Sequence, residues 1–462
     1  MNRKIFRSKH RIGVIGTRYS GKTVFITSLI SHIKNHNPEI LRLKSGNTRI
    51  IFDTEHPAEK GFEKFEYTKH LAKAIDHRCW PDQTEKTSQF RCSFFRTDWL
   101  WTIGELSISD IPGERLCDIL MARMDYAQWC DWLLGFMDAD QEHEYQKLYK
   151  EYEGFLDSLG DKPLDQTLLE ETKNQIIQRY SALLVGLCLG YRPIVTPSTF
   201  ILSTDGKHLG EFIDNKDFSQ CHPGLDAQQV FAPLPSKFRE NNPVLAKVFT
   251  QHYKAYQNKI AIPLLNLFSS CNELVILVDI TTLLNGNTAM YNGNRELVER
   301  IVECLSPGDG LFGNIGRLLS KFFGGHFGLG GIQRLAFVAP KADLVHKNDR
   351  PKLKALLEQM TKGFIDRLLQ IKVKLACEYF ASAAVKAAEC LPDGKIKGYT
   401  NQDHPVLFES SPSNVPDEWP HSWNLGDHRF HSVGPKFPKN IGIPPPHINM
   451  DAIIDFLLAP ID

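Results

Sequence analysis

Residues 16–23 read Gly-x-x-x-x-Gly-Lys-Thr and stand between a short apolar run, residues 11–15, and a stretch with helical periodicity, residues 24–33. A strand, a glycine-bounded loop and a helix in this order define a P-loop, whose backbone N–H groups surround nucleotide phosphates. Glycine lets the backbone wrap around an anion, and the helix N-terminus attracts negative charge. A glycine-containing turn before an ordinary helix is the alternative. The pattern predicts an α/β fold built around a phosphate site.

The side chains and amides of this loop have distinct expected roles. Lys22 supplies a point charge at the β- and γ-phosphate oxygens, and the hydroxyl of Thr23 is a ligand for Mg²⁺. Backbone amides are expected around the diphosphate from Arg18, Tyr19, Ser20, Gly21, Lys22, Thr23 and Val24. A nucleotide and Mg²⁺ are therefore the predicted cofactors.

Composition narrows the class of protein. At 462 residues the chain is long enough for more than one domain. Lys plus Arg equals Asp plus Glu at 54 each, so no overall positive field attracts nucleic acid or an acidic membrane. The 10 cysteines form no Cys-x-x-Cys pair, which indicates reduced thiols in a cytoplasmic protein. We expect neither a signal peptide nor a membrane-spanning segment.

A second phosphate-side segment is expected at residues 77–87, where nucleotide switches keep a loop with one threonine that reaches Mg²⁺ and the γ-phosphate. Thr84 is the preferred threonine and Thr87 is the alternative. A plain surface loop with ordinary threonines also remains open.

Asp110-Ile-Pro-Gly113 directly follows an alternating stretch, residues 100–109, that is typical of a strand. The Asp110 carboxylate would hold Mg²⁺ through water, and the Gly113 N–H would sense the γ-phosphate. Asp-x-x-Gly alone is a common turn, but its place about ninety residues behind a P-loop favours the functional interpretation. Glu114 stands where Ras-like GTPases keep a water-orienting glutamine, and a weak base and a plain surface charge are the two roles open to it; we expect slow hydrolysis.

Two further elements point to the base of the nucleotide. Lys341 and Asp343 follow an expected buried strand, residues 334–339. A carboxylate there can accept the N1–H and N2–H groups of guanine while the lysine stem lies along the base; adenine lacks this donor pair. Ser382 and Ala383 resemble an element whose backbone N–H contacts the guanine O6, although a small-residue turn explains them nearly as well. GTP is therefore favoured over ATP.

The chain is expected to form a nucleotide-binding domain interrupted by a largely helical insertion, because charged helical segments separate two parts with buried-strand patterns. The expected domains are residues 1–137 and 263–400 for the nucleotide-binding domain, 138–262 for the insertion and 401–462 for a Pro- and aromatic-rich tail packed on the body.

The P-loop, Trp-Pro-x-x-Thr at 80–84, Asp-Ile-Pro-Gly at 110–113, Pro-Lys-Ala-Asp at 340–343 and the Ser-Ala segment resemble the YcjX family of bacterial stress-associated P-loop NTPases. The resemblance covers essentially the whole chain. It implies a Ras-like, mostly parallel sheet flanked by helices, with a helical insertion as in heterotrimeric G-protein α subunits, and regulation by GTP against GDP. It also implies a protein partner at the inner membrane.

Two positions need comment within this resemblance. In G-protein α subunits an arginine before the switch threonine acts on the transition state, and Arg78 is the matching residue, at a wider spacing from Thr84. Pro340 replaces the usual Asn or Thr, whose side chain ties the base loop to the P-loop. The sequence predicts a cytoplasmic, Mg²⁺-dependent GTP switch, peripheral at the inner membrane if that partner is met. An ATP-utilising ATPase or kinase and a non-hydrolysing GDP-bound scaffold are the alternatives.

Overall fold

The computed structural model describes residues 6–16, 20–43, 48–76, 79–81, 87–99, 102–111, 115, 118–139, 146–160, 169–189, 197, 229–304, 332–371, 375–400 and 406–459. The chain divides into two compact units: unit 1 is residues 1–113, 269–291 and 305–462, and unit 2 is residues 114–268 and 292–304. Residues 114–137, predicted to belong to the nucleotide-binding domain, group with unit 2. The assignment of an inserted domain stays a prediction.

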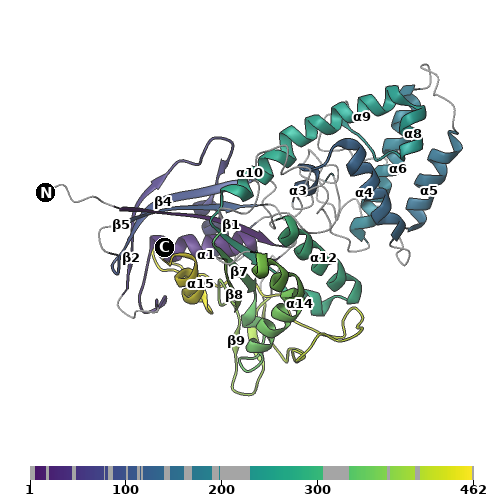
Figure 1. The fold of residues 1–462 in the computed structure, drawn as a ribbon. Helices are drawn as coiled ribbons and strands as arrows, with labels where there is room; N and C mark the ends of the chain where they lie inside the picture. Colours follow the sequence, from purple (N-terminus) through teal and green to yellow (C-terminus); the bar gives the residue numbers. More distant parts are fainter. Residues whose placement is uncertain are drawn as a thin grey trace. The chain divides into compact units, whose positions relative to one another are not determined.

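Unit 1 contains an eight-stranded, mostly parallel sheet (Figure 1). Its strands are β1 (Phe6–Gly16), β2 (Ile50–His56), β3 (Glu63–Lys64), β4 (Ser88–Arg96), β5 (Thr102–Asp110), β6 (Glu273–Leu277), β7 (Arg334–Ala339) and β8 (Ala376–Ala381). The order is β2-β4-β5-β1-β6-β7-β8, and β3 pairs with β4. Strands β5, β1, β6, β7 and β8 are parallel, whereas β4 runs antiparallel to β5 and β2. The predicted parallel α/β sheet is confirmed in this coarse form.

Central strands of this sheet are apolar because helices cover their side chains. Every residue of β6 is buried, as expected for a strand in the middle of a parallel sheet. The helices and turns of unit 1 include α1 (Lys22–Lys34), α2 (Tyr67–Asp76), α11 (Ile280–Asn285), η6 (Ala342–Leu344), α14 (Arg350–Ile371) and α15 (Met450–Leu457). A small antiparallel sheet holds β9 (Glu389–Cys390), β10 (Ile396–Tyr399) and β11 (Leu407–Ser410).

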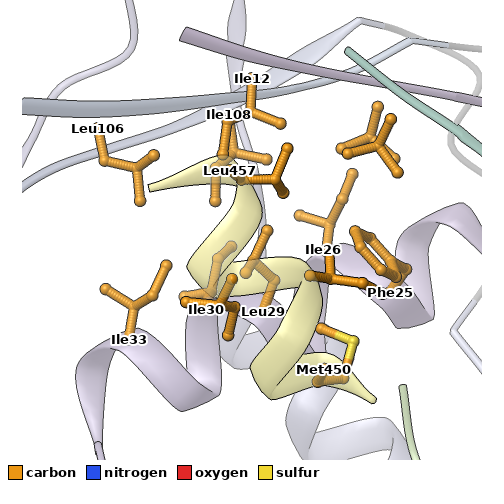
Figure 2. Packing of buried hydrophobic residues seen from close by; sticks show 14 of the residues in the cluster. Ile12, Phe25, Ile26, Leu29, Ile30, Ile33, Leu106, Ile108, Met450 and Leu457 are labelled. Atoms are coloured by element: carbon orange, nitrogen blue, oxygen red, sulfur yellow. The ribbon is translucent and has the colours of Figure 1, made fainter. Parts of the chain in front are cut away.

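One core joins α1 and α15 to the sheet. Figure 2 shows Ile26 and Leu29 of α1 beside Met450 and Leu457 of α15, with Ile108 of β5 facing them. Burial of these side chains removes apolar surface from water and supplies the main stabilising term of the unit. The helix that starts at the glycine loop is therefore fixed on its rear face by residues from the far end of the sequence.

The described residues of unit 2 form helices and turns. Its helices are α3 (Asp118–Met121), α4 (Tyr126–Ala139), α5 (Gln146–Ser158), α6 (Leu169–Leu189), α8 (Ser236–Asn241), α9 (Pro243–Tyr256) and η5 (Gln257–Ala261), while α10 (Ile262–Ser270) and α12 (Thr288–Cys304) share residues with unit 1. Trp129 is fully buried, 5.3 Å from the ring of Phe231 and 5.4 Å from that of Tyr253. Among the described helices of both units, none has the length and apolar character to cross a membrane.

Candidate nucleotide site at the carboxyl edge of the sheet

Strand β1 lies where the order of the parallel strands reverses, with β5 on one side and β6 on the other. Ligands of open α/β sheets bind outside the carboxyl ends of the strands at such a point. The register places the strand ends level with each other: Gly16 pairs with Leu277, Leu277 with Val338, and Ala339 with Ala381. The residues that follow these strands, which carry the predicted motifs, therefore gather at one edge.

The described ends of the glycine loop, Gly16 and residues 20–23, have backbone features that suit a phosphate site. Gly21 has φ +81°, a left-handed conformation that glycine adopts without strain, and α1 begins directly after it. A Cβ on Gly16 would lie 2.5 Å from Ser20 Oγ and 2.7 Å from the Leu277 carbonyl, so the close approach of loop and strand requires glycine there. The predicted strand and helix on either side of the loop correspond to β1 and α1.

The donors at this loop fit an anion. The N-cap of α1, Gly21, has no side chain to accept from the first N–H groups, and the first turn carries no acidic residue. Ser20 Oγ is buried and has no hydrogen-bond partner among the described residues. Lys22 Nζ donates to the Gly16 carbonyl at 3.2 Å, so its charge is held over the loop. These groups fit a nucleotide phosphate with Mg²⁺, for which Thr23 would supply a hydroxyl.

Asp110 ends β5 beside the loop and is fully buried. In the β1–β5 ladder it pairs with Val14, and in the β4–β5 ladder with Ser88, the residue after Thr87. Because β4 runs antiparallel to β5, its first residue, Ser88, lies at the edge of the sheet where Asp110 sits. Trp80 of the predicted switch segment is anchored by a 2.6 Å hydrogen bond from Nε1 to the Val433 carbonyl.

Several predicted site residues lie outside the described residues. They are Arg18, Tyr19, Arg78, Thr84, Gly113 and Glu114.

Lys341 forms an ion pair that the sequence reasoning missed. Its Nζ lies 2.5 Å from Oδ2 of Asp279, which is 2% exposed and follows β6. The carboxylate also accepts from the Thr281 hydroxyl at 2.7 Å and from the Thr282 N–H at 3.0 Å. Burial alone would raise the pKa of Asp279, but Lys341 and these donors hold it below its usual value. Asp279 could have been found because a carboxylate after a buried parallel strand lies at the ligand edge.

Asp343, the predicted guanine acceptor, is already hydrogen-bonded through one oxygen. Its Oδ2 accepts the N–H groups of Ala387 and Ala388, each at 2.9 Å. Burial raises the pKa of Asp343, against the opposing effect of these two donors. Since the two N–H groups use the lone pairs of Oδ2, a guanine edge would bind at Oδ1.

The Ser-Ala element is hydrogen-bonded to a segment near the C-terminus that the sequence motifs did not predict as its partner. The N–H of Ala383 donates to the Ile448 carbonyl at 3.1 Å, and the N–H of Ile448 returns a 2.9 Å hydrogen bond to Ala383. Ser382 Oγ also donates to the Ile448 carbonyl, at 2.8 Å. Sequence reasoning missed this bridge because residues around 448 carry no pattern that names their partner.

A mixed, mostly parallel sheet with a glycine loop and a helix at its switch point defines an α/β protein compatible with the P-loop fold. The model of the YcjX-like family, DUF463, matches residues 10–460, and the chain belongs to this family. The resemblance predicted from the motif order is thus confirmed.

Two curated relatives are similar over nearly the whole chain. "Ras-like GTPase YcjX" of Escherichia coli (strain K12) is 24% identical over 476 residues, which cover 97% of this chain and 95% of that protein. "Ras-like GTPase YcjX" of Shewanella oneidensis (strain MR-1) is 23% identical over 499 residues, which cover 97% of this chain and 94% of that protein.

Proposed function

We propose that this protein is a GTP-binding switch that hydrolyses GTP slowly with Mg²⁺. The observation that carries the proposal is the convergence at one sheet edge of the glycine loop, the buried Asp110 and the Lys341–Asp343 segment. The name that the curated relatives carry, Ras-like GTPase, supports the choice of nucleotide and of reaction.

In this proposal, different residues of the chain bind the phosphate oxygens, Mg²⁺ and the γ-phosphate. Lys22 exchanges its hydrogen bond to the Gly16 carbonyl for the β- and γ-phosphate oxygens. Thr23, Thr84 and Asp110 hold Mg²⁺, which supplies charge neutralisation at the phosphates when bound. Gly113 binds the γ-phosphate through its N–H.

Two residues of the proposal concern water attack. Glu114, in place of a water-orienting glutamine, makes hydrolysis slow, and Arg78 stabilises the transition-state charge.

Residues 138–262 form the inserted helical domain, and the family resemblance supports a stress-associated role with a protein partner at the inner membrane.

One observation favours the alternative in which the P-loop serves ATP or holds a nucleotide without selecting the base. The N–H of Ala383 and one oxygen of Asp343 already have protein partners. Contact of a guanine base with the Ala383 N–H therefore requires a rearrangement, whereas binding of tripolyphosphate alone does not.

Replacement of the loop lysine tests the phosphate site. Lys22→Ala removes a charge-assisted interaction with the phosphates, and we expect affinity for GTP and GDP to fall at least about 100-fold in titration calorimetry with Mg²⁺. Lys347→Ala, an exposed lysine beyond the base loop, is the control and should bind as the wild type does. Affinity of Lys22→Ala within about threefold of wild type would contradict the assignment.

The base assignment is tested separately with Asp343→Asn. The amide oxygen can still accept from Ala387 and Ala388, whereas the second acceptor is replaced by a donor that faces the N–H edge of guanine. We expect GDP affinity to fall about 10- to 100-fold while tripolyphosphate affinity changes less than about twofold. If the wild type bound ATP as tightly as GTP, the choice of guanine would be wrong.

A further inference from the structure

Residues 446–449, which we call the strap, are hydrogen-bonded through Pro446, Ile448 and Asn449 to residues 381–386, the segment that contains the Ser-Ala element. Besides the Ala383–Ile448 bridge, the N–H of Lys386 donates to the Pro446 carbonyl at 2.7 Å. Asn449 Nδ2 donates to the Ala381 carbonyl at 2.7 Å. The strap therefore covers the backbone that follows β8, where the predicted base contact lies.

The bridge occupies the one donor that guanine would need. A backbone N–H makes one strong hydrogen bond, and that of Ala383 points to the Ile448 carbonyl at 3.1 Å. Ala383 is 1% exposed, so no water replaces this partner freely. A guanine O6 can accept from Ala383 only after the Ile448 carbonyl has moved. The N6 group of adenine is a donor and gains nothing from that movement.

The residues next to the strap and next to Ala383 have anchors that do not involve the Ala383–Ile448 bridge. Asn449, the last residue of the strap, adopts φ 58°, a left-handed conformation, so the chain changes direction directly before α15. Met450 next to it is fully buried in the core and keeps α15 in place. On the other side, Ser28 Oγ of α1 donates to the Ala384 carbonyl at 2.5 Å. The residue after Ala383 is thus held by the helix that begins at the phosphate loop.

We propose that the strap competes with the guanine base for the N–H of Ala383, so that guanine nucleotides release it and adenine nucleotides leave it bound. This inference rests on the proposed function, since it assigns the base site its regulation. The Ser28 contact supplies the link to the P-loop helix that Pro340 cannot make, and it keeps the base loop in register with the phosphates while the strap opens.

A disulfide lock tests the competition in one protein. Ala383 and Ile448 are directly paired in an antiparallel bridge and exchange both hydrogen bonds, a pairing with Cα atoms about 5.5 Å apart that suits a disulfide. Ala383→Cys with Ile448→Cys is prepared oxidised and then reduced, and mass spectrometry of peptides verifies the bond. Wild type treated in the same way controls for its own cysteines.

The disulfide is expected to lower the affinity for guanine nucleotides and to leave phosphate binding unchanged. Upon reduction we expect GDP affinity to rise at least about tenfold, while the affinities for ADP and tripolyphosphate change less than about twofold. Equal GDP affinity in the oxidised and reduced forms overturns the competition. If the wild type binds tripolyphosphate and GDP and the lock has no effect, only the strap proposal fails. If it binds neither, the proposed function fails with it.

Hydrogen exchange gives a second readout that does not depend on the cysteines. In the wild type, the Ile448 N–H should exchange faster with GDP than with ADP, because only guanine releases the strap, which carries this N–H, from the Ala383 carbonyl. Asn449→Gly keeps the left-handed conformation and removes the side-chain bond to Ala381, and it should raise GDP affinity at least about threefold. Equal or slower exchange with GDP overturns the proposal.

Discussion

The carboxylate of Asp279 is the residue that fixes the base loop. It is 2% exposed and caps the N-terminus of α11 through the Thr282 N–H, while Lys341 closes over it. Lys341 itself has φ 61°, an uncommon conformation for a residue with a Cβ. The ion pair and the strained backbone together hold Lys341 on the sheet edge beside the residue predicted to contact guanine.

Removal of this carboxylate is predicted to destabilise unit 1. Asp279→Ala deletes the helix cap and the acceptor of the Thr281 and Thr282 hydroxyls, while Lys341, which is 36% exposed, can turn to water. We expect the free energy of unfolding to fall by about 1–3 kcal/mol at pH 7. Urea titration measures the change.

The unfolding free energy that Asp279 contributes depends on pH. The folded-state pKa of Asp279 lies below the ordinary value of 3.8, so its stabilising effect is complete above pH 3.8 and is lost as the pH falls further, through the lower pKa of the folded state. Asp393→Ala, an ion-paired aspartate on the surface, serves as the control. If both variants unfolded at the same urea concentration as the wild type, Asp279 would not fix the loop.

At the scale of elements, α1 meets the segment before α15 through histidines. His32 of α1 is fully buried, and neither of its ring nitrogens has a hydrogen-bond partner among the described residues. Its ring meets that of His447 edge-on, with centroids 4.8 Å apart. His36 lies one turn further along, and Asp451 is the carboxylate that acts on His447. The contact between α1 and the segment that bears the strap therefore depends on neutral imidazoles.

Acid is predicted to weaken this contact. Burial, then His447 and His36, lower the pKa of His32 well below 6.5 in the folded state. The unfolded chain consequently takes up the proton first, and stability is kept above pH 6.5 and falls below it. We expect His32 to account for about 1 kcal/mol of lost unfolding free energy between pH 7.5 and 5.5.

Denaturation of His32→Phe at several pH values tests this. The variant should lose part of the acid sensitivity of the wild type, and His421→Phe, at an exposed position, should retain all of it. An unchanged slope of stability against pH in His32→Phe would show that the buried ring does not titrate on unfolding.

On the scale of the whole molecule, the sequence predicted those strands and helices whose formation depends on neighbouring residues. The expected buried strand at 334–339 is β7, most of the alternating stretch at 100–109 lies in β5, and the expected helix at 24–33 lies within α1. Glycine and carboxylate spacing located the ligand edge, because the ends of parallel strands meet there. The helix α14 (Arg350–Ile371) was not predicted.

The contacts that the sequence did not reveal join distant residues. Ala383 with Ile448, Lys341 with Asp279, and Ser28 with Ala384 have no common local pattern, and each depends on the tertiary fold. A motif names a chemical group and its chain neighbours, but a backbone N–H has a partner only once the sheet and its connections exist. The sequence therefore predicted which residues form the base site, but it did not predict which of their hydrogen-bonding groups already have partners within the protein.

Residues 450–457 are translated long after β1, yet both belong to one buried core. At roughly 5–20 residues per second, about 20 to 90 s of synthesis separates them. A nascent chain that has not reached α15 leaves the apolar faces of α1 and β5 open to water. We therefore expect a chain truncated ahead of α15 to expose this apolar surface and to be prone to aggregation.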